Sequence, residues 1–238
     1  MHKRTCEQIV EQPRAENYDI ISFDCYGTLV DWETSIVQTT QEILLSNDAH
    51  MNDNVVLEYF ADFEPTEQTN GGSYRQILRR VLQRYGTRLG FVPTEDQLQM
   101  FEECVANSSP FDDTIASLHS LHSTFQLAII SNTDRELFAI TQSNLQTTFD
   151  YVITAEDVGV YKPNVKVFEY AFERFGNKSR VLHVAQSIFH DIEPANQLDL
   201  DAVWIDRTEG RLGATKETSF TPKLQFSSLK EFCETFLV

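Results

Sequence analysis

Short runs of apolar, β-prone residues recur along the chain, and each run ends in polar or turn-forming residues. They cover residues 20–23, 125–130, 151–154, 181–185 and 202–205. A strand that is buried on both faces has such a continuous apolar pattern. Helical patterns lie between the runs, at residues 114–122, 136–142, 165–175 and 194–198. Strands that alternate with helices predict an α/β fold with a doubly wound, parallel sheet.

The stretch from residue 33 to residue 108 has a different pattern. It contains no strand-like run, and its apolar residues recur at helical spacing, as in Ile77, Leu78, Val81, Leu82 and Tyr85. Turn-forming residues at 46–48, 70–72 and 86–93 divide it into about four helices. We predict that residues 33–108 form an all-helical cap.

The residues on either side of this insertion are assigned to a core and a leader. Residues 17–32 and 109–238 are predicted to form a Rossmann-like core, and residues 1–16, which are polar and aperiodic, a loose N-terminal leader. Because the cap directly follows the first strand's loop, it is placed to close over the carboxyl edge of the sheet, where open α/β folds bind ligands.

Composition and charge narrow the choice of partners. Of 238 residues, 41% are hydrophobic and 23% are charged, as in a globular chain. The formal net charge of −17 disfavours nucleic acid and anionic membranes. The four cysteines lack zinc-ligand spacing, and no apolar segment has the length of a signal or a membrane span. We expect a cytoplasmic protein with a small-molecule substrate, no nucleic-acid or membrane partner, and either a monomer or a homodimer.

Polar residues at the ends of the first two core strands are candidates for chemistry. Asp24 ends the first strand, before a turn at Gly27 whose N–H groups and Thr28 hydroxyl could hold an anion. Ser131 and Asn132 end the second strand. Taken singly, such residues are more typical of turns and helix caps. Because the carboxyl ends of parallel strands share one edge, we expect these side chains to converge.

Two further loops add charged and titratable groups. Lys162 precedes a proline, and at the mouth of the sheet its ammonium could balance an unpaired carboxylate. The loop after residues 181–185 contributes Gln186, Ser187, His190 and Asp191. Asp191 could instead cap a helix, and His190 could act as a base near neutral pH. His183, within the strand, and Cys25 are expected to be core residues.

Together these motifs resemble the haloacid dehalogenase (HAD) superfamily, and within it the type II 2-haloacid dehalogenases. The resemblance runs from Tyr18 to about Gly210 and rests on four motifs in the family's order. They are Phe23-Asp24-Cys25-Tyr26-Gly27-Thr28-Leu29, Ser131-Asn132, Tyr161-Lys162-Pro163 and the loop from Gln186 to Asp191. The resemblance implies a nucleophilic Asp24, an anion-binding Ser131, a Lys162 that orients Asp24, and an Asp191 that handles water or metal.

This resemblance defines the expected site. Catalytic roles are expected for Asp24, Lys162 and Asp191. Substrate-binding roles are expected for Tyr26, Thr28, Ser131, Asn132, Gln186, Ser187 and His190.

One substitution separates the superfamily's two main chemistries. Related phosphatases carry a second Asp two residues after the nucleophile, to protonate the leaving oxygen, and this chain has Tyr26 there. A halide leaves as a stable anion and needs no such acid. The phosphatases also hold magnesium with paired acids in the fourth motif, where Gln186 and Ser187 replace the first acid. We therefore expect attack at carbon through an ester intermediate, with no metal and no other cofactor.

The chain also departs from the dehalogenases that it resembles. In those enzymes an Arg early in the cap receives the halide and the carboxylate, but residues 52–67 contain neither Arg nor Lys. Phe168 replaces an aromatic hydroxyl, and Ile188 replaces an Asn. Because a buried carboxylate needs a charged partner, we expect a larger and less charged substrate than a small haloacid.

The roles of two sets of cap residues have alternatives, and three other functions remain under consideration. Of Arg75, Arg79, Arg80, Arg84 and Arg88, most are expected to be solvated, although one could replace the lost Arg. Phe60, Phe63 and Phe101 are predicted to be helix core rather than substrate contacts. The alternative functions are opening or rearrangement of an epoxide on the same site, a phosphatase that uses Mg²⁺, and a non-catalytic binding protein.

Overall fold

Six parallel strands, in the order β3-β2-β1-β4-β5-β6, form the centre of the structure. This computed structural model describes residues 12–208, 211, 213–216 and 218–238. The strands are β1 (Ile20–Phe23), β2 (Gln126–Ser131), β3 (Tyr151–Thr154), β4 (Val181–Ala185), β5 (Asp201–Ile205) and β6 (Gln225–Phe226). The predicted doubly wound parallel α/β fold is confirmed. The two-residue strand β6 was not predicted, because two residues are too few to set a pattern.

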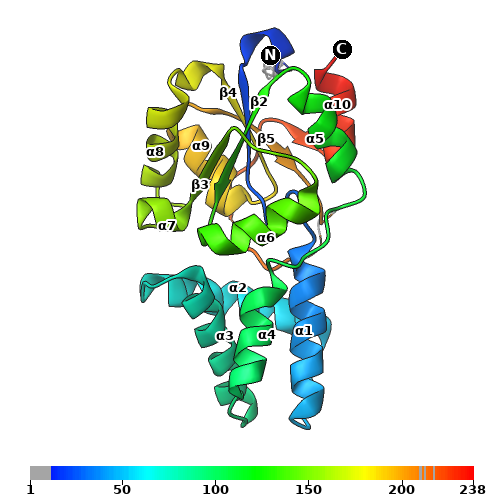
Figure 1. The fold of residues 1–238 in the computed structure, drawn as a ribbon, viewed down its shortest axis with the longest axis vertical. Coiled ribbons are helices and arrows are strands. Elements are labelled where there is room, and N and C mark those ends of the chain that lie inside the picture. Colours follow the sequence, from blue (N-terminus) through cyan, green and yellow to red (C-terminus); the bar gives the residue numbers. More distant parts are fainter. Residues whose placement is uncertain (1–11, 209–210, 212, 217) are drawn as a thin grey trace, which may run out of the picture.

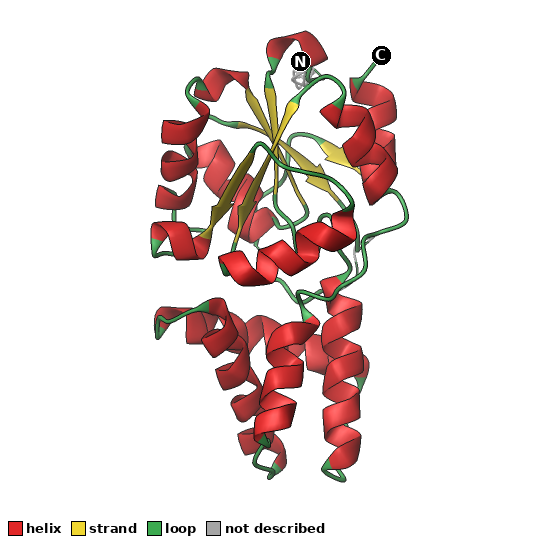
Figure 2. Cartoon of the chain, in the orientation of Figure 1, coloured by secondary structure: helices red, strands yellow, loops and turns green. Residues whose placement is uncertain are grey.

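Helices cover both faces of the sheet, as Figures 1 and 2 show. Alternate residues of β2 point to opposite faces, so that Leu127 and Ile129 join one hydrophobic cluster, and Ala128 and Ile130 join the other. The first cluster packs against α5 (Thr114–His122), α6 (Arg135–Leu145) and α10 (Leu229–Phe236). The second packs against α8 (Lys166–Phe175) and α9 (Glu193–Gln197). Both faces of the sheet are therefore buried.

Short helical segments complete the core. They are the 3-10 helices Ala15–Asn17 and Lys178–Arg180, α7 (Ala155–Val158) and a π-helical turn at Ile188–Ile192. Most of the predicted leader, residues 1–11, lies outside the described residues. No helix in the described part of the chain has the length and apolar character needed to cross a membrane.

Four helices lie between β1 and α5 and form a separate layer beyond the sheet (Figure 1). They are α1 (Trp32–Ser46), α2 (Asp53–Thr69), α3 (Tyr74–Leu89) and α4 (Glu95–Cys104). Local capping explains where they begin: the Asp31 side chain accepts from the Thr34 N–H before α1, and Ser73 and Thr94 form capping boxes before α3 and α4. We keep residues 33–108 as the proposed limits of this cap.

The predicted break at residues 86–93 is present, but it begins at Gly90 and not at Gly86, because α3 continues to Leu89. Gly86 has a different role. A Cβ atom added there would lie 2.5 Å from the carbonyl oxygen of Phe91 and 2.9 Å from Pro93 Cδ. The glycine therefore allows the chain to fold back against α3 after the helix ends at Gly90, which has a φ of +84°.

Asp134, in the loop after β2, connects the core to the cap. Its two carboxylate oxygens accept hydrogen bonds from the backbone N–H groups of Tyr74 (2.7 Å) and Arg75 (2.9 Å). The first N–H groups of a helix have no partner within the helix, and its dipole favours a carboxylate there. A second link joins the Tyr161 hydroxyl to the carbonyl of Gly72 at 3.0 Å. These contacts fix the start of α3 against the core.

We predict that Asp134→Ala lowers the free energy of unfolding by about 1–2 kcal/mol, because two N–H groups at the start of α3 lose their acceptor. Chemical denaturation followed by circular dichroism measures this change. Asp62→Ala, which removes an exposed carboxylate from α2, is the control. Equal unfolding free energies for the two variants would contradict a structural role for Asp134.

Candidate active site

Asp24 lies where the order of the strands reverses. β1 pairs with β2 on one side and with β4 on the other, and open α/β sheets bind ligands outside the carboxyl ends of the strands at such a point. The Asp24 N–H donates to the carbonyl of Val184 at 3.2 Å, which extends the β1–β4 ladder by one residue. The turn that follows needs Gly27, whose φ is +87°. The backbone of Asp24 is therefore held by the sheet itself.

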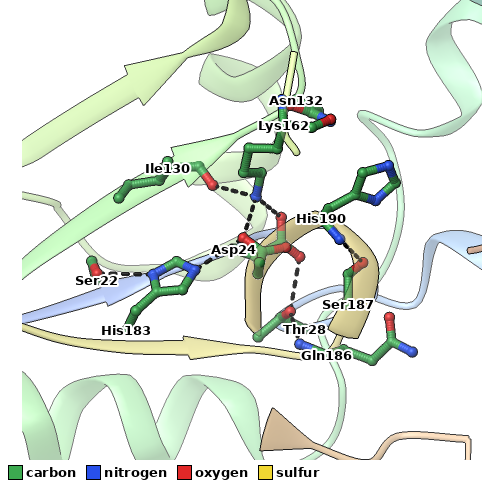
Figure 3. A network of polar contacts seen from close by, with 11 residues as sticks. Ser22, Asp24, Thr28, Ile130, Asn132, Lys162, His183, Gln186, Ser187 and His190 are labelled. Atoms are coloured by element: carbon green, nitrogen blue, oxygen red, sulfur yellow. Dashed lines mark hydrogen bonds and ion pairs between the residues drawn. The ribbon is translucent and has the colours of Figure 1, made fainter. Parts of the chain in front are cut away.

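The Lys162 ammonium bonds both carboxylates of the site. It donates to Asp24 Oδ1 at 2.9 Å, to Asp191 Oδ1 at 2.6 Å and to the carbonyl of Ile130 at 2.8 Å (Figure 3). Three donors meet three acceptors, so the ammonium is fully hydrogen-bonded. Lys162 is 1% exposed, and a charge at such depth is strongly destabilising unless it is paired.

Thr28 and Asn132 hold the pair in position. The Thr28 hydroxyl donates to Asp24 Oδ2 at 2.8 Å and accepts from the Gln186 N–H at 2.8 Å. The Asn132 amide accepts from the Lys162 N–H at 2.7 Å and donates to the Lys162 carbonyl at 3.0 Å. Each oxygen of Asp24 therefore has one hydrogen-bond donor.

Burial and neighbouring charges shift the pKa values of Asp24, Asp191 and Lys162 in different directions. Burial raises the pKa of Asp24; Lys162 opposes this shift, and the Asp191 carboxylate adds to it. Burial would also raise the pKa of Asp191, but Lys162 and His183 outweigh it and lower that pKa below its usual value. Burial would lower the pKa of Lys162, but Asp191 and Asp24 raise it. Lys162 and Asp191 thus stay charged at neutral pH.

His183 is buried in the core, as expected, but it also contacts the site. Its Nδ1 lies 2.9 Å from Ser22 Oγ, and its Nε2 lies 2.9 Å from Asp191 Oδ1. Ser22 and His183 are direct neighbours in the β1–β4 register. Phe168 packs edge-on against the imidazole, with 5.2 Å between ring centroids. The phenyl ring in place of an aromatic hydroxyl therefore supports a histidine that orients Asp191.

A cavity of about 30 Å³ lies between Asp24 and the cap. Its core lining is Asp24, Tyr26, Ser131, Asn132, Lys162, Ser187, His190, Asp191 and Thr215, and its cap lining is Trp32, Glu64 and Tyr74. Four buried polar atoms among these residues have no hydrogen-bond partner: Trp32 Nε1, Ser131 Oγ, His190 Nε2 and Asp191 Oδ2. Unpartnered buried polar atoms are rare, and four in one cavity are suited to a polar ligand.

Eight of the ten residues expected from the sequence line this cavity. Thr28 does not, because its hydroxyl is enclosed between Asp24 and the Gln186 backbone. The side chain of Gln186 lines a neighbouring cavity of about 730 Å³, which also borders Trp32. Tyr26 lines the Asp24 cavity, but its hydroxyl lies 3.0 Å from Thr141 Oγ1.

The sequence analysis missed the cap side of the cavity. Glu64 is 5% exposed and lies on the buried face of α2 with Val56 and Phe60. A charged residue at a buried position of an amphipathic helix is the signal that could have found it. Burial raises the pKa of Glu64 to about 7, although hydrogen bonds from Tyr74 and Gln68 lower it. By contrast, burial lowers the pKa of His190 to about 4.

The five arginines of α3 do not replace the missing cap Arg, since none of them lines the Asp24 cavity. Arg75 and Arg79 pair with Glu102, and Arg80 and Arg84 pair with Glu67. The guanidinium of Arg88 bonds the Tyr59 hydroxyl. Phe60 and Phe101 are fully buried, and Phe63 packs on aromatic neighbours, so all three belong to the helix core as predicted.

The two aspartates of the site are bonded by an ammonium, an arrangement that does not fit the needs of a magnesium centre. Mg²⁺ needs several oxygen ligands in an octahedral arrangement. Here the Lys162 ammonium bonds one oxygen of Asp24 and one of Asp191. Within the described residues, no group of three or more His, Cys, Asp and Glu side chains is placed to hold a metal ion. The two carboxylates therefore fit an ammonium better than a divalent cation.

Comparisons with known proteins agree with this geometry. A family profile described as haloacid dehalogenase-like hydrolase matches residues 18–199. The (S)-2-haloacid dehalogenase 1 of Pseudomonas sp. strain CBS-3 is 24% identical over 221 residues, which cover 90% of this chain and 95% of that protein. A pyrimidine 5′-nucleotidase of Escherichia coli K12 is 31% identical over 102 residues, which cover 41% of this chain and 45% of that protein.

A solved structure has a similar fold. It is an L-2-haloacid dehalogenase of Xanthobacter autotrophicus with chloropropionic acid covalently bound. Its TM-score is 0.73 at 18% sequence identity, with 91% of this chain and 97% of that chain covered. At this identity the likeness concerns the fold.

We predict that Lys162→Met lowers the free energy of unfolding by about 3–5 kcal/mol near neutral pH, since two buried carboxylates lose their shared cation. In the variant the pKa values of Asp24 and Asp191 in the folded state rise above those in the unfolded state. The folded state then binds more protons, so the variant loses stability as the pH rises from acid to neutral.

Denaturant unfolding at a series of pH values measures this effect. Lys166→Met, the same change at an exposed position four residues later, is the control and should follow the pH dependence of the wild type. A Lys162→Met protein that gained stability as the pH rose would show that Lys162 does not balance these carboxylates.

Proposed function

The chain belongs to the haloacid dehalogenase-like hydrolases, and we propose that it hydrolyses a small electrophilic substrate through an ester formed at Asp24. The arrangement of Asp24 carries the proposal: it lines the cavity, and its carboxylate is held by Lys162 Nζ and Thr28 Oγ1. The similarity to proteins named (S)-2-haloacid dehalogenase makes carbon–halide bonds the first class to consider.

In the first step the Asp24 carboxylate attacks a saturated carbon of the substrate. A carbon–oxygen bond forms, and the bond to the leaving group breaks with its electron pair. Lys162 stabilises the ionised form of Asp24 and fixes its direction. The unpartnered Ser131 hydroxyl is suited to hold a polar group of the substrate. Because the reacting groups are held in place before the substrate binds, little reorganisation is needed in the transition state.

In the second step water attacks the carbonyl carbon of the Asp24 ester. Asp191 Oδ2 and His190 Nε2 both line the cavity without a partner, and both belong to groups with a lowered pKa. Near neutral pH Asp191 is ionised and His190 is neutral, so either can accept a proton from the water. The ester carbon–oxygen bond breaks, and the leaving alkoxide takes that proton and departs as the alcohol. Asp24 keeps the oxygen of the water as a carboxylic acid and releases its remaining proton to solvent.

We further propose that the reaction needs no metal or other cofactor, because Lys162 takes the position between Asp24 and Asp191. Every group assigned to the reaction comes from one chain, so the proposal does not depend on a homodimer. Cys25, Cys104 and Cys233 are buried and unpaired, which supports a reducing, cytosolic location. The net charge of −17 supports a small-molecule substrate over nucleic acid.

We predict that Asp24→Asn lowers kcat/KM by more than about 1,000-fold while the protein stays folded, because an amide of nearly the same shape is a far poorer nucleophile. A single turnover of the wild type in ¹⁸O-water should place the heavy isotope in the peptide that contains Asp24, as mass spectrometry would show. Asp19→Asn, at the exposed opposite end of β1, is the control. Turnover by Asp24→Asn, with label only in the product, would contradict the ester.

We predict that exhaustive chelation leaves kcat/KM unchanged, since an ammonium already bonds the two aspartates. A phosphatase that uses Mg²⁺ would instead lose its activity on chelation. We test this alternative because the chain is similar to a nucleotidase. Magnesium is added back after chelation, with both an alkyl halide and a phosphate ester as substrates. Activity that disappears with the chelator and returns with magnesium would replace our proposal by the phosphatase.

A further inference from the structure

The cap contributes a carboxylic acid to the cavity of Asp24. Glu64 lines this cavity from α2, beside Trp32 from α1 and Tyr74 from α3. Its carboxyl group is held by Gln68, whose amide nitrogen donates to Glu64 Oε1 at 2.6 Å. The side chain is therefore an ordered part of the cavity wall.

The position of Glu64 matters because, in a displacement at a saturated carbon, the attacking and leaving atoms lie on one line through that carbon. The leaving atom departs on the side opposite to the attacking oxygen. Asp24 lies at the carboxyl edge of the sheet, and the cap helices lie beyond that edge (Figure 1). A leaving group displaced by Asp24 is therefore directed at the wall formed by Trp32, Glu64 and Tyr74.

Among the described residues, no cation lines that wall. The arginines of α3 bond Glu67, Glu102 and Tyr59, and Lys162 lies on the core side with all three ammonium protons engaged. A leaving halide would therefore meet a carboxyl group instead of a guanidinium. The carboxylate of a haloacid would share a small cavity with Asp24, Asp191 and Glu64, and in the described part of the chain a single ammonium lines that cavity to balance them.

Glu64 is also a lining group that changes protonation near neutral pH. Burial raises its pKa to about 7. The pKa of His190 is lowered to about 4, and that of Asp191 is also lowered. The pKa values of Lys162, Tyr26, Tyr74 and the adjacent Tyr161 are raised further above neutrality. Asp24 has a raised pKa and must be ionised to react.

We propose that Glu64 is a general acid that protonates an oxygen leaving group, so that the substrate is an uncharged electrophile of the epoxide class. The inference rests on the proposed role of Asp24 as nucleophile. Asp24 attacks an epoxide carbon, the carbon–oxygen bond breaks, and the released oxygen takes the proton of Glu64. Water then attacks the ester carbonyl, and its proton passes through Asp191 or His190 to the departing alcohol. The Asp24 carboxylic acid left behind returns a proton to Glu64.

Three small probes of similar size test this assignment on the full chain. Glycidamide is an uncharged epoxide, 2-chloropropionamide is uncharged with a halide leaving group, and 2-chloropropionate is a haloacid anion. We expect kcat/KM to be highest for glycidamide and lowest for 2-chloropropionate. The reaction with glycidamide should decline above about pH 7, where Glu64 loses its proton.

Glu64→Gln removes the proton donor but keeps the shape of the side chain. It should lower kcat/KM for glycidamide by about 100-fold more than for 2-chloropropionamide, and the decline above neutral pH should vanish. Glu64→Asp, which keeps an acid, should restore part of the glycidamide activity. Glu67→Gln makes the same change one turn further along α2, at an equally buried position outside the cavity, and should not alter the ratio between the two probes.

The outcomes separate this inference from the proposed function. Equal losses for the two uncharged probes in Glu64→Gln would overturn the general-acid role, and so would a wild-type preference for 2-chloropropionate. If the wild type formed an Asp24 ester in either of these cases, the proposed function would stand. If none of the three probes formed an ester at Asp24, both proposals would fall.

Discussion

The buried Lys162 ammonium is the interaction on which the site depends. Its three hydrogen bonds reach β2, the residue after β1 and the turn after β4. These segments lie far apart in the sequence and meet at the reversal of the strand order. Removal of any one acceptor would leave part of a buried charge uncompensated, so the sheet, the ammonium and the two carboxylates form one unit. Asn132 and Thr28 extend that unit by one layer of hydrogen bonds.

The sequence was sufficient for five of the six strands and for most of the core side of the site. Apolar runs that end in polar residues are local patterns, and Asp24, Ser131, Lys162 and Asp191 each stand at the end of such a run or in a short motif. The contact between His183 and Asp191 could not be predicted in this way, because it depends on the register of β4 and on the course of the following turn. Gly86 was misinterpreted for a similar reason, since a distant carbonyl explains it.

The cap shows how charge can be redistributed without a change of fold. The positive charges of α3 are neutralised within the cap, where Glu67 takes two guanidinium groups and Glu102 takes two. Glu64, three residues before Glu67 on the same helix, has no guanidinium partner within the described residues and lines the cavity instead. The solvation of its carboxyl group therefore differs from that of its neighbour, and so does its protonation. A helical cap can in this way place a carboxylic acid on a cavity wall without a change of fold.

The central position of β1 also bears on how the chain reaches this structure. Its partners are Gln126–Ser131 and Val181–Ala185, so β1 must wait until residues 126–131 have been synthesised before either ladder can form. The cap helices between them contact one another over short sequence separations and can form early, whereas the sheet needs loop closures that are slow. During that interval an apolar strand with two unpaired edges is exposed, and such edges are prone to aggregation unless they are covered.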